Sequence, residues 1–290
     1  MTRPDSAGRW ILAGLLVSAL GCSLFTARPF GRDSSSSAAG TEAARRPLPG
    51  AGGAGTPSLF PAFSSGLPAD ATPTLCDANA EFGADGSVLP TAAYIKGIRG
   101  AAQSLPLDCE SRSAVDWAGY FGVEIDELAF FQKIPPSDNP DKGFVGSVYG
   151  QWGNIPPHSY GVHAGPVAFL LRYYGLNAYA YRGLSWDQLR AEIAAGRPVI
   201  VWVVGHIWQS TPLTMTVAGG EAVLVARLEH TVILTGYSAT TASVLDGATR
   251  YSVAIPAFLD SWGTLGNMGI VGRILPARPD CAGRAVELVP

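Results

Sequence analysis

The feature that most constrains the fold is an unbroken apolar segment, Val199–Val204, which follows Pro198. Because side chains alternate between the two faces of a strand, an apolar residue at every position predicts burial on both faces. Such a segment is typical of a central strand with other elements packed against each side. The chain has 290 residues, of which 47% are hydrophobic, so it can build the large core that this strand requires.

The patterns on the two sides of this segment differ. Helices are expected over residues 109–121, 124–133, 163–174, 185–196 and 255–261, and further strands over residues 92–98, 177–181, 213–217, 222–228, 230–235, 242–245, 251–254 and 268–271. Ser185 and Gln188 form a capping-box pattern at the start of one of the helices. Helices that come mostly first, with antiparallel strands afterwards, predict an α+β fold.

The amino-terminal residues have the pattern of an export signal. Arg3 and Arg9 precede a short apolar run over residues 10–20. This run is too short for a comfortable membrane span. We interpret residues 1–21 as a signal peptide or an uncleaved signal anchor. The residues before Cys22 also resemble a bacterial lipoprotein cleavage site, so lipidation of Cys22 is a third interpretation. All three place the rest of the chain outside the cytoplasmic membrane, attached to it or secreted.

A tether and one folded domain are expected after the export signal. Residues 22–75 are rich in Ser, Ala, Gly and Pro and offer too little apolar surface to order themselves, so they predict a flexible tether. The folded domain is predicted over residues 76–290, with its core at about 93–272. Cys76 and Cys281 bracket this domain. They are either joined by a disulfide, which an exported chain permits, or remain two free, packed thiols.

Charge and cysteine spacing exclude several functional classes. The formal net charge is −3 and no basic stripe is present, so a nucleic-acid partner is not expected. The absence of a Cys-x-x-Cys pair argues against a zinc knuckle or a thioredoxin-type redox site. Asp138, Asn139 and Asp141 lack the downstream Glu of a calcium-binding EF-hand loop, and we interpret them as turn residues. No cofactor or metal is expected.

Cys109 is the strongest candidate for a reactive residue. Asp108 is a good N-cap, and a buried stripe formed by Ala114, Trp117, Ala118 and Phe121 follows it, so Cys109 falls in the first turn of a helix. The positive end of the helix dipole favours a thiolate there, and a thiolate attacks carbonyl carbon. Gln103 lies six residues upstream and has an amide N–H to offer to the resulting oxyanion. The alternative is a cysteine that is only packed in the core.

A cysteine nucleophile needs an imidazole and a group that orients the ring. His230 begins a buried strand, and Asp246 ends the next strand, just before Gly247. If the two strands pair as a hairpin, Asp246 returns to the level of His230 and its carboxylate can accept the imidazole N–H. The alternatives are a core histidine whose hydrogen bonds are satisfied and an aspartate that forms a turn.

The order Gln, Cys, His and Asp resembles the papain-like clan of cysteine peptidases, and in particular family thirty-nine, the bacteriocin-leader-processing type and its stand-alone exported relatives. The matching stretches are residues 103–109, 196–201, 230–237 and 245–247, within a span of about 93–272. The resemblance implies Cys109 as nucleophile, His230 as general base and acid, Asp246 as the orienting group and Gln103 as oxyanion donor. It also implies N-terminal helices packed on an antiparallel sheet, with a cleft between them.

Two features depart from that family. Glu110 follows the cysteine where many relatives carry Gly, and a carboxylate there opposes a thiolate. The leader-processing enzymes are fused to a transporter, whereas this sequence has no membrane bundle and no nucleotide-binding motif. Cleavage of a double-glycine leader is therefore not the expected reaction, and the sequence leaves the substrate open.

The leading functional hypothesis is an exported, membrane-tethered thiol hydrolase that cleaves amide bonds in a peptide or protein substrate. A second hypothesis is a catalytically silent cell-surface binding module, in which Tyr149, Trp152 and Tyr160 of a long loop contact the ligand. A third keeps the chemistry but transfers the acyl group to an amine. The sequence does not separate hydrolysis from transfer, and it leaves the oligomeric state open.

Overall fold

The structure, a computed structural model, describes residues 88–275 and 286–290, which all belong to one compact unit, Asp70–Pro290. The predicted export signal over residues 1–21, the predicted tether over residues 22–75, Cys76 and Cys281 lie outside the described residues. Cys109, which lies inside them, is a free thiol. In the described part of the chain, none of the helices has the length and apolar character needed to span a bilayer.

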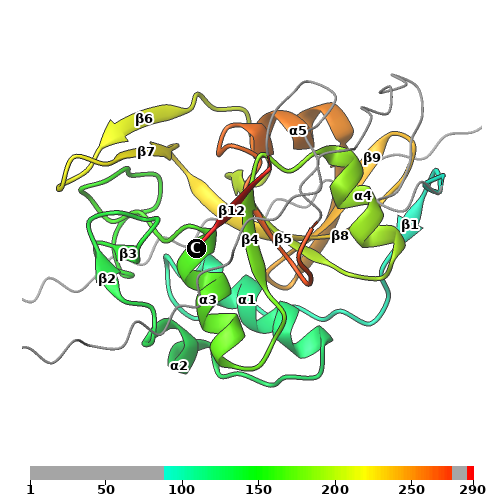
Figure 1. Ribbon diagram of the computed structural model, residues 1–290, viewed down its shortest axis with the longest axis horizontal. Helices are drawn as coiled ribbons and strands as arrows, with labels where there is room; N and C mark the ends of the chain where they lie inside the picture. The colour runs from blue at the N-terminus through cyan, green and yellow to red at the C-terminus, as the bar shows by residue number, and fades with distance from the viewer. Residues whose placement is uncertain (1–87, 276–285) are drawn as a thin grey trace, which may run out of the picture. The chain divides into compact units, whose positions relative to one another are not determined.

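The centre of the domain is an antiparallel sheet of eight strands in the order β10-β9-β8-β5-β11-β4-β12, with β1 paired to β8 (Figure 1). Its strands are β1 (Ala93–Tyr94), β4 (Tyr179–Arg182), β5 (Val199–Val204), β8 (Glu229–Tyr237), β9 (Thr241–Asp246), β10 (Thr249–Ala254), β11 (Gly269–Val271) and β12 (Glu287–Val289). All six residues of β5 are buried, which confirms the predicted central strand.

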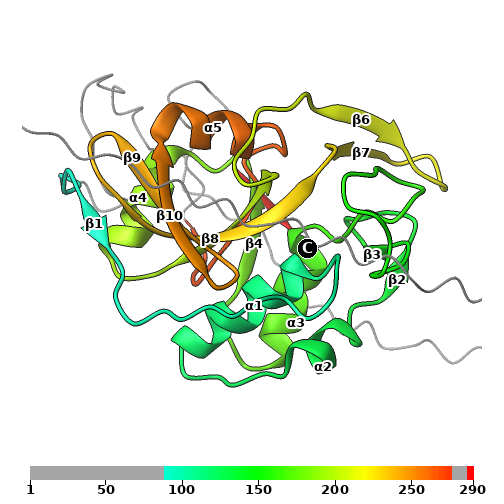
Figure 2. The same ribbon diagram turned by 180° about the vertical axis from the view of Figure 1, so that it is seen from behind.

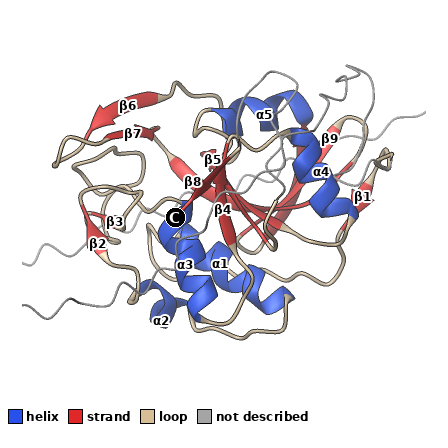
Figure 3. Ribbon diagram, viewed as in Figure 1, coloured by secondary structure: helices blue, strands red, loops and turns tan. Residues whose placement is uncertain are grey.

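The described residues form five helices: α1 (Cys109–Tyr120), α2 (Glu127–Phe131), α3 (Ala164–Tyr173), α4 (Trp186–Ala194) and α5 (Ile255–Gly263). Helices α1 and α3 pack on one face, with α2 against α1, while α4 and α5 pack on the opposite face (Figure 3). Because both faces are covered, the apolar side chains of β5 are buried on each side. The predicted α+β fold, with helices packed on an antiparallel sheet, is confirmed.

Two smaller sheets lie to one side of the main one (Figure 2). Strands β2 (Pro136–Ser137) and β3 (Phe144–Val145) pair in parallel, and β6 (Leu213–Thr216) pairs with β7 (Ala222–Val225) as an antiparallel hairpin. A second hydrophobic cluster joins them and consists of Val145, Tyr160, Val217, Val223 and Val225. This cluster anchors the long loop that the sequence predicted around Trp152.

Helix α1 begins at Cys109, as predicted, and its inner face is held at both ends. Ala114, Trp117 and Ala118 are buried, but Phe121 is 39% exposed because it is the C-cap residue rather than part of the helix. Trp117 Nε1 donates a hydrogen bond to the Pro198 carbonyl over 2.8 Å, which ties the helix to the start of β5. Gly122 follows with φ +82°, and this left-handed conformation ends the helix.

Several predicted elements are shorter in the structure. The strand expected over residues 92–98 is only β1, and the helix expected over residues 124–133 is only α2. The side chain of Asp126 accepts a hydrogen bond from the Ala129 backbone N–H, so Asp126 is the N-cap and the helix begins after it. The capping box of Ser185 and Gln188 is present at the start of α4.

Candidate active site

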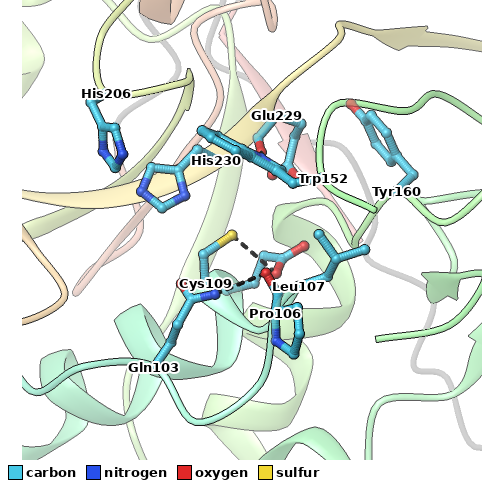
Figure 4. A pocket seen from close by; sticks show the side chains of 10 residues that line it. Gln103, Pro106, Leu107, Cys109, Trp152, Tyr160, His206, Glu229 and His230 are labelled. Carbon is cyan, nitrogen blue, oxygen red and sulfur yellow. Dashed lines mark hydrogen bonds between the residues drawn. The ribbon is translucent and has the colours of Figure 1, made fainter. Parts of the chain in front are cut away.

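A cavity of about 200 Å³ opens between the start of α1 and the start of β8. Gln103, Cys109 and His230 line it together with the carboxylic acids Glu110 and Glu229 (Figure 4). Trp152, Tyr160 and His206 complete its wall from other loops. The fold therefore brings three of the four predicted site residues, which are up to 127 positions apart in the chain, to one cavity.

The sulfur of Cys109 is hydrogen-bonded to its neighbour in the sequence. Cys109 is only 8% exposed, and its Sγ–H donates to Glu110 Oε2 over 3.3 Å. Burial raises the pKa of the Cys109 thiol well above its usual value, and the carboxyl groups of Glu110 and Glu229 raise it further. Desolvation and these two acids therefore oppose the thiolate that the sequence predicts at the helix start.

Asp108, the predicted N-cap, occupies that position but does not cap through its side chain. Its φ of −126° and ψ of 22° are outside the extended region that N-caps adopt, and its carboxylate makes no capping hydrogen bond. Burial raises the pKa of Asp108 to about 7, and the nearby acids Glu127 and Glu110 add to this increase. The side-chain cap that the sequence predicted at Asp108 is therefore absent.

The imidazole of His230 and the carboxylate of Asp246 form the predicted hydrogen bond. His230 Nε2 lies 2.7 Å from Asp246 Oδ1, and only 9% of each side chain is exposed. Strands β8 and β9 pair antiparallel with Leu245 opposite Ile233, which returns Asp246 to the first part of β8, close enough for its carboxylate to reach the His230 ring. Since Nε2 is engaged by the carboxylate, Nδ1 is the ring nitrogen left for the cavity. Within the described residues, Nδ1 and Cys109 Sγ share that cavity without a hydrogen bond between them.

Asp246 accepts more hydrogen bonds than the sequence predicted. Its Oδ2 lies 2.7 Å from His206 Nδ1 and 3.0 Å from the Tyr251 hydroxyl, which donates to it. Burial alone would raise the pKa of Asp246, but the hydrogen bond and charge of His230, with the bonds from His206 and Tyr251, lower it to about 2. The carboxylate is therefore ionised throughout the ordinary pH range and fixes the orientation of two imidazole rings.

His206 is a residue of the site that sequence reasoning missed. It follows β5 in a turn where Gly205 (φ +51°) and Ile207 (φ +66°) both adopt left-handed conformations, and the Trp208 N–H closes the turn on the Val204 carbonyl over 2.8 Å. A positive φ is rare for a β-branched residue, so this turn is a constrained feature. No short-range pattern in the sequence points from His206 to Asp246, because the two meet only through the pairing of strands.

The ring of Trp152 packs against the imidazoles of both His206 and His230. Its ring centroid lies 5.9 Å from that of His230 and 5.8 Å from that of His206. The indole Nε1 donates to the Glu229 carbonyl over 2.9 Å, which locks the ring above the start of β8. The long loop that carries Trp152 thus shields the His230–Asp246 pair from water.

Gln103 lies beside Cys109, but its amide is engaged within its own loop. The Nε2 group donates to the carbonyls of Leu105 over 2.8 Å and Pro106 over 3.0 Å. These two bonds use both N–H groups of the amide. To donate to an oxyanion, as the family resemblance implies, Gln103 has to release one of them.

The remaining two histidines and the predicted turn residues do not line the cavity. His163 is fully buried and its Nδ1 lies 2.5 Å from Asp141 Oδ1, while Arg182 also binds this carboxylate. Asn139 Oδ1 accepts from the Asp141 backbone N–H, which is the turn chemistry expected of this segment. His158 is exposed at the surface, away from the residues that line the cavity.

Known proteins resemble this chain in family and fold. Residues 100–270 match the Peptidase_C39 like family, whereas a search of curated proteins finds no match. A crystal structure of a Bacillus anthracis protein classed as a C39-like peptidase has a TM-score of 0.56 and 24% identity, covering 63% of this chain and 97% of that one. Its likeness shows the shared fold.

Two further structures are more distant. A double glycine motif protease from an AMS/PCAT transporter, solved with its leader peptide, has a TM-score of 0.36 and 16% identity, covering 62% of this chain and 96% of that one. Xylellain, a cysteine protease from Xylella fastidiosa, has a TM-score of 0.36 and 12% identity, covering 64% of this chain and 87% of that one.

Proposed function

Because this chain belongs to the Peptidase_C39 like family, we propose that it is a peptidase in which Cys109 attacks the amide carbonyl, His230 carries the proton and Asp246 orients the imidazole. One observation supports these roles most strongly. The His230–Asp246 pair, joined over 2.7 Å, opens into the same cavity as the sulfur of the only described free thiol. Nucleophile, base and orienting acid are the three parts that thiol-dependent acyl transfer requires.

The proton transfers follow from the fact that Nδ1 of His230 is not bonded to Asp246 and can accept a proton. His230 Nδ1 takes the proton of the Cys109 thiol, and the sulfur forms a bond to the carbonyl carbon of the substrate. The oxyanion accepts the Cys109 backbone N–H at the start of α1 and one amide N–H of Gln103. The protonated His230 then gives its proton to the leaving amine as the C–N bond breaks. Water, deprotonated by the same imidazole, hydrolyses the acyl-enzyme and regenerates the thiol.

Before the first step, the sulfur has to exchange partners. In the resting arrangement the Cys109 Sγ–H donates to Glu110 Oε2 over 3.3 Å, and burial raises the pKa of the thiol. We propose that rotation about the Cα–Cβ bond of Cys109 transfers the sulfur from Glu110 to His230. The imidazolium that forms is stabilised by the Asp246 carboxylate, whose pKa is lowered to about 2.

The substrate that the cavity fits is a peptide or an extended protein segment. Leu107, Pro106 and Trp152 supply apolar walls, and the cavity volume of about 200 Å³ suits one or two side chains rather than a folded domain. We further propose that the domain works outside the cytoplasmic membrane, tethered to it or released. This localisation is supported by Arg3, Arg9 and the apolar run over residues 10–20.

Iodoacetamide labelling together with peptide digestion tests the peptidase assignment. Purified chain is expected to alkylate at Cys109 and to cleave members of a peptide library, and Cys109→Ala and His230→Ala should abolish cleavage. His158→Ala is the matched control, since His158 is exposed and lies outside the cavity. Full cleavage by the Cys109→Ala variant would contradict the proposal.

A catalytically silent binding module is the second candidate, and one observation favours it. The sulfur of Cys109 is bonded to Glu110 rather than to His230, and its pKa is raised. A silent module predicts that Cys109 alkylates as slowly as an unactivated buried thiol, that His230→Ala leaves this rate unchanged, and that no peptide is cut. Peptides that bind without being cleaved, measured by calorimetry, would establish this alternative.

A further inference from the structure

Three groups that bind metals meet at the floor of the cavity. The sulfur of Cys109 and carboxylate oxygens of Glu110 and Glu229 all lie within 4.8 Å of one another, and all three residues are buried. Figure 4 shows the sulfur of Cys109 below the side chains of Trp152 and Glu229. Cys109 Sγ and Glu110 Oε2 are 3.3 Å apart, close to the sulfur–oxygen edge of about 3.6 Å that a tetrahedral zinc site produces.

The two acids of this cluster have no protein counter-ion. Among the described residues, no lysine or arginine forms an ion pair with Glu110 or Glu229. Glu229 is 3% exposed, and its buried Oε1 has no hydrogen-bond partner although the residue lines the cavity. Buried acceptors without a donor are rare in folded proteins and call for an explanation. A cation bound in the cavity is the simplest one.

The backbone leaves room for both carboxylates. A Cβ atom at Gly161 would lie 2.3 Å from Glu110 Oε1 and 2.7 Å from Glu229 Oε2, so any larger residue would push the two acids away. The Val162 N–H donates to Glu110 Oε1 over 2.6 Å and fixes that carboxylate, with Oε2 turned toward the sulfur. Such a bond from the surroundings orients a ligand in the way that metal sites require.

We propose that Cys109, Glu110 and Glu229 bind a thiophilic divalent cation, of which Zn²⁺ is the representative, and that the ion reversibly masks the nucleophile. Thiolate and carboxylate together suit Zn²⁺, and three protein ligands leave a fourth position open toward the cavity. Binding forms the metal–sulfur bond and releases the thiol proton, with any carboxyl protons, to solvent. No electron is transferred. The lone pair of the Cys109 sulfur, which would attack a carbonyl carbon, is then bound to the metal.

A second cluster, His206, His230 and Asp246, also has ligand atoms within 4.8 Å of one another. Its donors and acceptors already satisfy each other, since the carboxylate of Asp246 engages both imidazoles and also accepts the Tyr251 hydroxyl. A metal there would have to break these hydrogen bonds, whereas at Glu229 it gains an oxygen without a partner. The cluster that contains the sulfur is therefore the preferred site.

Titration of the full chain with Co²⁺, a spectroscopic substitute for Zn²⁺, tests the proposal without any substrate. We expect a thiolate-to-cobalt charge-transfer band in the near ultraviolet that saturates at one ion per chain. Zn²⁺ should displace Co²⁺ and protect Cys109 from iodoacetamide, and EDTA should restore labelling. The band should vanish in Cys109→Ser, which separates this sulfur from Cys22, Cys76 and Cys281.

A conservative variant of one carboxylate ligand and a variant of the second cluster test which residues bind the ion. Glu229→Gln keeps the size of the side chain but removes its charge, and it should weaken Co²⁺ binding at least tenfold, while His206→Ala should leave the affinity unchanged. Circular dichroism checks that both variants are folded. The proposal is overturned if no thiolate band appears, if Glu229→Gln binds Co²⁺ as tightly as the parent, or if His206→Ala loses the band. Because no step requires turnover, these results are independent of whether the chain proves to be a peptidase.

Discussion

His206 Nδ1 and His230 Nε2 each lie 2.7 Å from a different oxygen of the Asp246 carboxylate. The two rings are 5.4 Å apart between centroids, and 54% of the His206 side chain is exposed while that of His230 is nearly buried. One carboxylate thus holds an inner imidazole that faces the sulfur and an outer imidazole at the mouth of the cavity. This relationship gives Asp246 a wider role than orienting a single ring.

Asp246→Ala is expected to lower kcat/KM about 10²–10⁴-fold, because general acid–base catalysis by His230 depends on the orientation of its ring. The measurement is hydrolysis of a peptide that the parent protein cleaves. Tyr251→Phe is the matched control, since it removes only the hydroxyl that donates to Asp246 Oδ2 over 3.0 Å. It should lose far less activity. Equal losses in the two variants would show that the carboxylate acts only through local structure.

His206→Ala is expected to lower kcat about tenfold, which corresponds to about 1.4 kcal/mol, with little change in KM. His206 holds Oδ2 of Asp246, while Oδ1 remains bonded to His230, so the variant loosens the carboxylate without removing it. As a positioning residue, His206 should also affect the pH profile of kcat, because the His230 ring is less firmly fixed. His206→Gln, which retains a donor, should recover part of the loss, and a variant with unchanged kcat and pH profile would rule out this role.

Glu110 should make the folded protein less stable as the pH rises. Burial raises the pKa of Glu110 from 4.5 to about 7, so between these values the folded state holds a proton that the unfolded state has released. The free energy of unfolding therefore falls between about pH 4.5 and pH 7, and Glu110→Gln should flatten this slope. Urea unfolding at several pH values measures it. Glu124→Gln, at an exposed position, should leave the slope as it is in the parent.

Trp117→Phe is expected to destabilise the domain by about 1–3 kcal/mol, because it leaves the buried Pro198 carbonyl without its donor. Trp117 is 1% exposed and ties α1 to the start of β5, so its loss also loosens the segment that carries Cys109. Urea denaturation gives the change in the free energy of unfolding. Trp208→Phe, at a ring that is 45% exposed, is the control and should change stability by less than 0.5 kcal/mol or so. A similar change in the free energy of unfolding in both variants would argue against a stabilising hydrogen bond between Trp117 and Pro198.

The sequence determined the core strand and the helix that carries the cysteine. Val199–Val204 is apolar at every position, and this pattern has one stable solution, burial on both faces. The capping box at Ser185 follows from local hydrogen bonds between residues close in the chain, whereas α1 begins at Cys109 without a side-chain cap from Asp108. The link between His230 and Asp246 was also predictable, because neighbouring antiparallel strands bring their ends close together.

Only the tertiary structure decided the electrostatics of the site. The helix dipole argues for a thiolate at Cys109, but burial and the approach of Glu229 from the distant strand β8 oppose that expectation. His206, in the turn after β5, meets Asp246 at the end of β9 although strand β8 lies between β5 and β9 in the sheet. Desolvation and charge depend on everything that surrounds a group in space, whereas the sequence specifies directly only what lies a few residues away along the chain.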